Sequence, residues 1–193
     1  GGFLAVSLTD FVQGCIMFVA LIVVPIVTWQ ELGNLGAAVQ TLTDLNPDYL
    51  SWFSGVTALG LISSLSWGLG YFGQPHIIVR FMAIRSMADM KTARRIGMTW
   101  MVTALIGAVL TGLLGFLYVR QTGSVLDDPE TVFILLSQVL FNPYISGFLL
   151  AAILVAIMST ISSQLLVSSS SLTEDFYKTF LRKSATQTEL VAI

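Results

Sequence analysis

Long apolar segments alternate along the chain with short polar ones, and their lengths predict membrane-spanning helices. A helix needs about 20 predominantly apolar residues to cross the hydrocarbon core of a bilayer. Three stretches meet that length, at about residues 7–29, 96–118 and 143–167. A fourth, at about 50–83, is too long for one straight span, so we expect it to be tilted or broken. The pattern therefore predicts an all-α membrane protein with four transmembrane helices in this chain.

The overlong segment carries a cluster of residues that disfavour a regular helix. Gly68, Gly70 and Gly73 relax the backbone, and Pro75 removes an N–H donor. Irregular backbone at membrane depth is tolerated beside a protein-lined or watery cavity, where secondary transporters bind solute and coupling ion. We expect a break near residues 68–75 that leaves backbone groups free to bind a ligand. A proline-kinked span or a packing face of small residues would give the same pattern.

Composition supports a membrane protein and argues against other classes. The 193 residues are 55% hydrophobic and only 10% charged, whereas a soluble domain carries about 25% charged residues. The net charge of −2 gives no basic field for nucleic acid, so we expect no such partner. His76 is the only histidine, which is too few for a multi-histidine metal site. The spans contain neither paired acids nor a placed base, so we expect no enzyme activity.

The distribution of positive charge predicts the orientation in the membrane. Eight of the nine lysine and arginine residues lie in the connection at 80–95 or in the C-terminal stretch, and only Arg120 lies on the opposite side. We expect a multi-pass protein of the cell (inner) membrane. By the positive-inside rule, both basic regions should be cytoplasmic, and with them both chain ends and the whole segment 168–193. The chain does not begin with Met, and we expect it to be a piece of a longer protein.

Three further features bear on packing. At the start of the first span, Thr9, Asp10 and Gln13 either anchor the helix at the head groups or face the helix bundle; we expect anchoring, which costs a carboxylate less. Residues 131–141 form either a short interfacial helix or the start of the next span. Small residues that would allow close helix approach occur in the third span at Gly107, Gly112 and Gly115.

The last span contains an unusual density of hydroxyl groups. Ala156, Ser159, Thr160 and Ser163 share one face by the three-and-four spacing of a helix. Hydroxyl and carbonyl oxygens suit a hard monovalent cation such as Na⁺, whereas Mg²⁺ or Ca²⁺ ordinarily requires carboxylates. Serine and threonine in spans also bond to their own helix or to a neighbouring one, which is their more frequent role.

Two aromatic residues and a proline border the expected break. Trp67, Tyr71 and Pro75 recur at every fourth position, so they would line one helix face or surround the same interruption. Aromatic rings beside free backbone groups could hold a small amphoteric solute, with its carboxylate at a half-helix N-terminus. Aromatic residues at this spacing more often serve packing alone.

Several stretches together resemble the sodium/solute symporter family. They read GGFLAVSLTDFVQG at 1–14, WGLGYFGQPHIIVRF at 67–81, ARR at 93–95, and AIMSTISSQLLV at 156–167 followed by TEDFYK at 173–178. The resemblance implies a five-plus-five inverted-repeat transporter core of the leucine-transporter kind. This chain would contribute the last helix of the first repeat and the first three of the second.

The resemblance also implies a sodium site. Its ligands would include the Ala156 carbonyl and the hydroxyls of Ser159 and Thr160. The remaining ligands would come from the first core helix, so the remainder of the same transporter chain is an expected partner. Na⁺ is then the coupling ion, and no organic cofactor is expected.

In the proline-transporting branch of the family, the solute contacts match Trp67, Tyr71 and Pro75. The implied function is sodium-coupled symport of a small solute, L-proline, across the lipid bilayer into the cell. The alternatives are a symporter for another amino acid or organic acid, a proton-coupled carrier, and a transporter-like membrane sensor domain.

Overall fold

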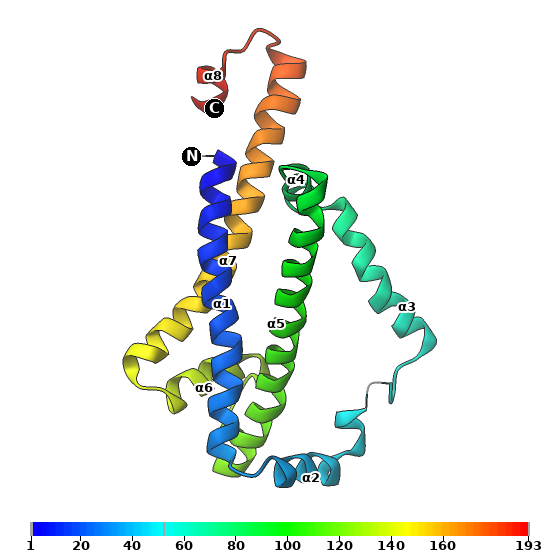
Figure 1. Ribbon diagram of the computed structural model, residues 1–193, viewed down its shortest axis with the longest axis vertical. Helices are drawn as coiled ribbons and strands as arrows, with labels where there is room; N and C mark the ends of the chain where they lie inside the picture. The colour runs from blue at the N-terminus through cyan, green and yellow to red at the C-terminus, as the bar shows by residue number, and fades with distance from the viewer. Residues whose placement is uncertain (1, 52, 193) are drawn as a thin grey trace.

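A computed structural model describes residues 2–51 and 53–192, and these described residues form helices and connections without a strand (Figure 1). The helical segments, with η marking 3-10 or π geometry, are α1 (Gly2–Leu32), α2 (Leu35–Leu45), η1 (Pro47–Leu50), α3 (Ala58–Ser66), η2 (Trp67–Gly73), α4 (Pro75–Met82), α5 (Met87–Thr122), η3 (Pro129–Thr131), α6 (Val132–Leu140), α7 (Pro143–Ser170), η4 (Ser171–Leu181) and α8 (Gln187–Ala192).

Three helical stretches are long and apolar enough to cross a membrane: α1, α5, and α7 continued by η4. Figure 1 shows α1 beside α5 and α7, and α1 contacts both. They correspond to the apolar stretches at 7–29, 96–118 and 143–167. The last helix runs further than expected, because α7 passes directly into the π-helical η4 and so takes up much of the segment 168–193.

Capping residues fix where two of the long helices begin. The Ser86 hydroxyl oxygen accepts a hydrogen bond from the Asp89 N–H at 3.3 Å, which starts α5 nine residues before its apolar stretch. The Asn142 side chain accepts from the N–H groups of Tyr144 and Ile145, both at 3.1 Å, and Pro143 occupies the first turn of α7. Both arrangements satisfy N–H groups that have no partner inside the helix.

The fourth expected span, residues 50–83, is divided in the structure. The Thr57 hydroxyl caps the start of α3 by accepting from the Gly60 N–H at 3.1 Å. The chain then tightens into the 3-10 segment η2, becomes extended at Gln74 (φ −103°, ψ 99°), and enters α4 at Pro75. In Figure 1, α3 leans away from the three long helices. The count of four transmembrane helices therefore stays a prediction.

The segment 131–141 contains a helix of its own. Its main element, α6, ends at Leu140, and the extended residues Phe141 and Asn142 separate it from α7. The first of the two interpretations, a separate short helix, therefore describes the chain here.

Glycine allows α5 to approach its neighbours closely. A Cβ atom added at Gly107 would overlap the carbonyl group of Leu21 in α1, and one at Gly115 would overlap the Val132 side chain in α6. Gly112 has open space around the same position. Two of the three glycines in this span thus serve the close helix packing that their sequence predicts.

The buried core lies where α1, α6 and α7 meet. It consists of Ala20 and Val24 from α1, Leu136 from α6, and Leu149 and Ala152 from α7. In a membrane, van der Waals contact between such closely fitted side chains drives helix association, since lipid tails are as apolar as leucine. This core fixes the position of α7 relative to α1.

The two ends of the molecule differ in charge. Figure 1 shows both chain ends, α4 and the start of α5 at one end, and α2 with the end of α5 at the other. The basic connection at 80–95 and the basic C-terminal stretch therefore lie at the same end, as the charge pattern requires. That this end is cytoplasmic stays a prediction.

Candidate functional site

The hydroxyl-rich face of α7 brings three oxygen atoms together. The Ser159 hydroxyl donates to the Ala156 carbonyl at 2.9 Å, and the Thr160 hydroxyl donates to the same carbonyl at 3.5 Å. Ser159 is half-buried and Thr160 is exposed. Each hydroxyl oxygen keeps lone pairs that can face a cation while its proton points to the carbonyl. The α-helix alone thus supplies three oxygen ligands of the type that Na⁺ accepts.

The aromatic pair lies on η2, just before the break at Gln74. The rings of Trp67 and Tyr71 meet edge to face, with centroids 5.6 Å apart and planes at 83°. Both side chains are exposed, by 75% and 44%. Pro75 starts α4 and has no N–H, and the Ile77 and Ile78 N–H groups both donate to the Gln74 carbonyl, at 3.0 and 3.2 Å. The two rings and the positive dipole end of α4 are therefore the groups that this break offers to an amino acid.

The structure does not bring the two candidate sets into direct contact. In the part of the chain that it describes, no hydrogen bond joins Trp67, Tyr71 or Pro75 to the three α7 residues. The helix α4 does contact α7. A side chain one and a half turns after Pro75 makes the polar link between them.

That link is a network of Asp10, Arg80 and Ser163. The Arg80 guanidinium Nη2 lies 2.5 Å from the Asp10 carboxylate Oδ2 and also donates to the Ser163 hydroxyl oxygen at 2.5 Å. The Ser163 hydroxyl is 3.2 Å from the same carboxylate oxygen and 2.7 Å from the Ser159 carbonyl. The network therefore ties α1, α4 and α7 together directly beside Ser159.

The network corrects the expected role of Asp10. Its side chain faces the helix bundle, where it is only 12% exposed, so the polar cluster at the start of α1 does more than anchor the helix at head groups. The second carboxylate oxygen, Oδ1, and Gln13 Oε1 are buried and have no hydrogen-bond partner among residues 2–51 and 53–192. A carboxylate in a spanning helix needs a partner of opposite charge. This rule indicates from the sequence that Asp10 has a basic partner, and the structure identifies that partner as Arg80.

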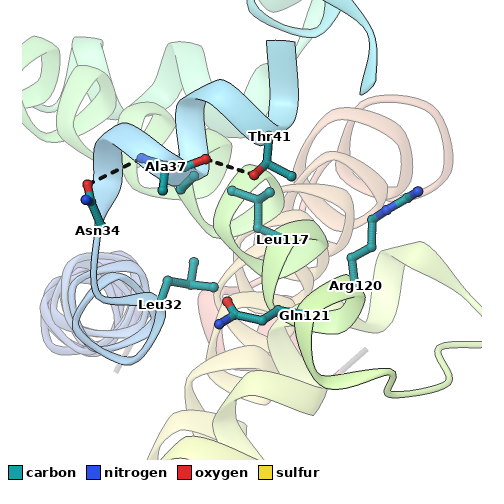
Figure 2. Close-up of a pocket in the computed structure, with 8 residues that line it drawn as sticks. Leu32, Asn34, Ala37, Thr41, Leu117, Arg120 and Gln121 are labelled. Carbon is teal, nitrogen blue, oxygen red and sulfur yellow. Dashed lines mark hydrogen bonds between the residues drawn. The ribbon is translucent and has the colours of Figure 1, made fainter. Parts of the chain in front are cut away.

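Two hollows lie at opposite ends of the molecule. One of about 400 Å³ opens beside the network and is lined by Phe3, Ser7, Asp10, Phe11, Arg80, Ala83 and Ile84. The other, of about 420 Å³, lies between the end of α1, α2 and the end of α5. Figure 2 shows Asn34, Thr41, Arg120 and Gln121 around it. None of the expected ligands lines either hollow.

The comparisons with known proteins cover nearly the whole chain. A model of the sodium:solute symporter family matches residues 1–193. The high-affinity proline transporter PutP of Bacillus subtilis (strain 168) is 62% identical over 191 residues, which are 99% of this chain and 40% of that protein. The osmoregulated proline transporter OpuE of the same organism is 56% identical over 193 residues, 100% of this chain and 39% of that protein.

A third relative comes from another genus. The sodium/proline symporter of Staphylococcus aureus is 58% identical over 178 residues, 92% of this chain and 35% of that protein. The chain thus spans about two fifths of the length of the curated relatives it matches. No solved structure matches it.

Proposed function

Because the chain belongs to the sodium:solute symporter family, we propose that it is part of a transporter that carries L-proline into the cell with Na⁺. The observation that carries this proposal is an identity of 56% to 62% with relatives named as proline transporters, over at least 99% of this chain. The apolar helices α1, α5 and α7 agree with a multi-pass membrane protein. Symport requires no covalent chemistry, so the protein acts as a transporter and has no catalytic residue.

Na⁺ binds on α7 in this proposal, at the Ala156 carbonyl and the hydroxyls of Ser159 and Thr160. Both hydroxyl oxygens lie beside this carbonyl, at 2.9 and 3.5 Å, and the same bonds also satisfy the hydroxyls within α7. Support for the assignment therefore comes from membership of the sodium:solute symporter family, whose model matches the whole chain. Further ligands come from other parts of the longer transporter. Dehydration of a small cation is offset by several oxygen dipoles at once, so losing one hydroxyl weakens binding without abolishing it.

Proline binds at the break between η2 and α4. The edge-to-face pair of Trp67 and Tyr71 receives the pyrrolidine ring, and the carboxylate lies at the N-terminal end of α4, which begins at Pro75. Support for this assignment comes from the relative named as an osmoregulated proline transporter, whose similarity covers the whole chain and so includes these three residues.

The two sites communicate through the network of Asp10, Arg80 and Ser163. Arg80 lies on the helix that begins at the solute site, and its partner Ser163 lies one turn from Ser159. A shift of α4 when proline binds therefore changes the polar contacts of α7. By linkage, Na⁺ raises the affinity for proline by the same factor by which proline raises the affinity for Na⁺.

The architecture in this proposal is a five-plus-five inverted repeat. The four spans are α1, the divided segment 50–83, α5 and α7, with the basic end in the cytoplasm. Rocking of one helix bundle against the other exposes both ligands to the inside. Each 100 mV of membrane potential contributes about 2.3 kcal/mol per sodium ion carried.

Sodium titration of transport tests the α7 site. In the full-length protein, Ser159→Ala and Thr160→Ala should each raise the Na⁺ concentration for half-maximal proline uptake by about tenfold, since a contact to a charged group is worth about 1.5–3 kcal/mol. Ser169→Ala is the matched control, because that hydroxyl also bonds back to α7, at 3.0 Å from the Leu166 carbonyl, but lies ten residues further along. Unchanged sodium dependence in both test variants would refute the assignment.

A further inference from the structure

A shallow groove runs between α1 and α5 near the basic end of the molecule. It has a volume of about 370 Å³ and is lined by Phe18 from α1 and by Arg95, Ile96, Thr99 and Trp100 from α5. The Trp100 indole N–H donates a weak hydrogen bond to the Gly14 carbonyl of α1, at 3.4 Å, which holds the ring as one wall of the groove. The two helices that form it lie side by side in Figure 1.

The polar and apolar groups of the groove lie on neighbouring faces of α5. Lys91, Arg95 and Thr99 follow each other at intervals of four residues, so they share one helix face. Ile96 and Trp100 each come one residue after a member of this set and are exposed by 66% and 36%. The surface therefore presents a stripe of two cations and a hydroxyl beside an apolar stripe.

The cations of this surface have no acidic partner in the structure. Within residues 2–51 and 53–192, no carboxylate forms an ion pair with Lys91, Arg94 or Arg95. The nearest acid in the sequence, Asp89, accepts a hydrogen bond from the Ser86 hydroxyl at 2.8 Å in the helix cap. These positive charges therefore remain available to an external anion.

From this arrangement we infer that the groove binds an anionic phospholipid. Lys91 and Arg95 hold the phosphate, the Thr99 hydroxyl donates to a phosphate or ester oxygen, and an acyl chain lies against Phe18, Ile96 and Trp100. A lipid fits better than a soluble anion, because the apolar wall belongs to two helices that are both long and apolar enough to span the membrane. Tryptophan and basic residues at such a boundary match the head-group region of a bilayer.

Quenching of tryptophan fluorescence by brominated lipids tests this inference. The full-length protein is placed in nanodiscs of phosphatidylcholine that contain increasing fractions of lipid brominated on the acyl chain, with either a phosphatidylglycerol or a phosphatidylcholine head group. The signal of Trp100 is the difference between the parent and Trp100→Phe. We expect half-maximal quenching at an about thirtyfold lower fraction of the brominated phosphatidylglycerol, the factor that corresponds to about 1 kcal/mol for each of the two basic side chains, Lys91 and Arg95.

Charge variants identify the cause of this preference. Arg95→Gln should reduce the difference to about fivefold, because Lys91 remains. Arg120→Gln, at the opposite end of α5, should leave it unchanged. Lys91→Gln gives an independent measurement if Arg95→Gln does not fold. Millimolar glycerophosphoglycerol, the soluble head group alone, should not relieve the quenching.

Four results would overturn the inference. Equal quenching by the two lipids would mean that the groove does not select charge. A preference that is undiminished in both Arg95→Gln and Lys91→Gln would place the lipid elsewhere. Relief of quenching by the soluble head group would indicate a site for a free anion, and no quenching by either lipid would mean that protein covers the groove.

Discussion

Replacing Arg80 by glutamine should destabilise the folded protein by about 2 kcal/mol. Exposed ion pairs are worth about 0–1 kcal/mol, and breaking a buried pair costs about 3–5 kcal/mol. The pair of Asp10 and Arg80 lies between these limits, because the carboxylate is 12% exposed and the guanidinium 49%. Without Arg80, the carboxylate would keep only the Ser163 hydroxyl on Oδ2, while Oδ1 already has no partner.

A double-mutant cycle separates the ion pair from other effects. Asp10→Asn should cost less, about 1 kcal/mol, because water can still reach the half-exposed Arg80. The double variant should cost about 1.5 kcal/mol, so the interaction energy of the pair is expected to be about 1.5 kcal/mol. The measurement is reversible unfolding of the full-length protein in mixed micelles of dodecyl maltoside and SDS.

A matched control distinguishes the pair from a general loss of charge. Arg85→Gln removes an exposed arginine for which the described residues show no ion pair, and it should change the free energy of unfolding by less than about 0.5 kcal/mol. If the costs of Arg80→Gln and Asp10→Asn simply add, the network does not stabilise the packing of α1, α4 and α7. The proposed link between the two sites would then have no energetic basis.

Two further predictions concern the solute site and the helix packing. Tyr71→Ala should raise the proline concentration for half-maximal uptake by more than it raises the Na⁺ concentration for half-maximal uptake. The control Phe72→Ala, which removes the neighbouring and more exposed ring, should change neither concentration. A larger effect of Tyr71→Ala on the Na⁺ concentration than on the proline concentration would refute its solute role. Gly107→Ala should destabilise the protein by about 2 kcal/mol, because the added methyl group would overlap the Leu21 carbonyl group. Gly112→Ala, where the same position has open space, should not destabilise it. Equal stability of the two variants in the same unfolding assay would show that α1 and α5 are not closely packed.

The hydrophobic pattern predicts the long helices well, because their apolar stretches are long enough to leave little choice. It does not predict their ends, which depend on single capping residues such as Ser86 and Asn142. The hydroxyl spacing on α7 also predicts that Ser159 and Thr160 lie on one face with Ala156, and both hydroxyls bond to the Ala156 carbonyl; their role as sodium ligands stays a prediction. Such local features follow from the 3.6-residue period of the helix alone.

The segment 50–83 and the role of Asp10 show what the pattern cannot supply. The glycine and proline residues mark the interruption before Pro75, but they do not predict the direction of α3, which leans away from the long helices in Figure 1. Likewise, the pairing of Asp10 with Arg80 joins residues 70 positions apart, and no local spacing encodes it. Only the packing of α1, α4 and α7 brings these two charges together.

Uptake of labelled L-proline by the full-length protein in proteoliposomes is the most direct test of the proposed function. An inward Na⁺ gradient is compared with an equal inward K⁺ gradient, with the folded state of the reconstituted protein checked in both preparations. We expect accumulation of proline with Na⁺ and none with K⁺. Equal uptake under both gradients would contradict sodium coupling, and no uptake of proline by the folded protein under either gradient would contradict the proposed solute.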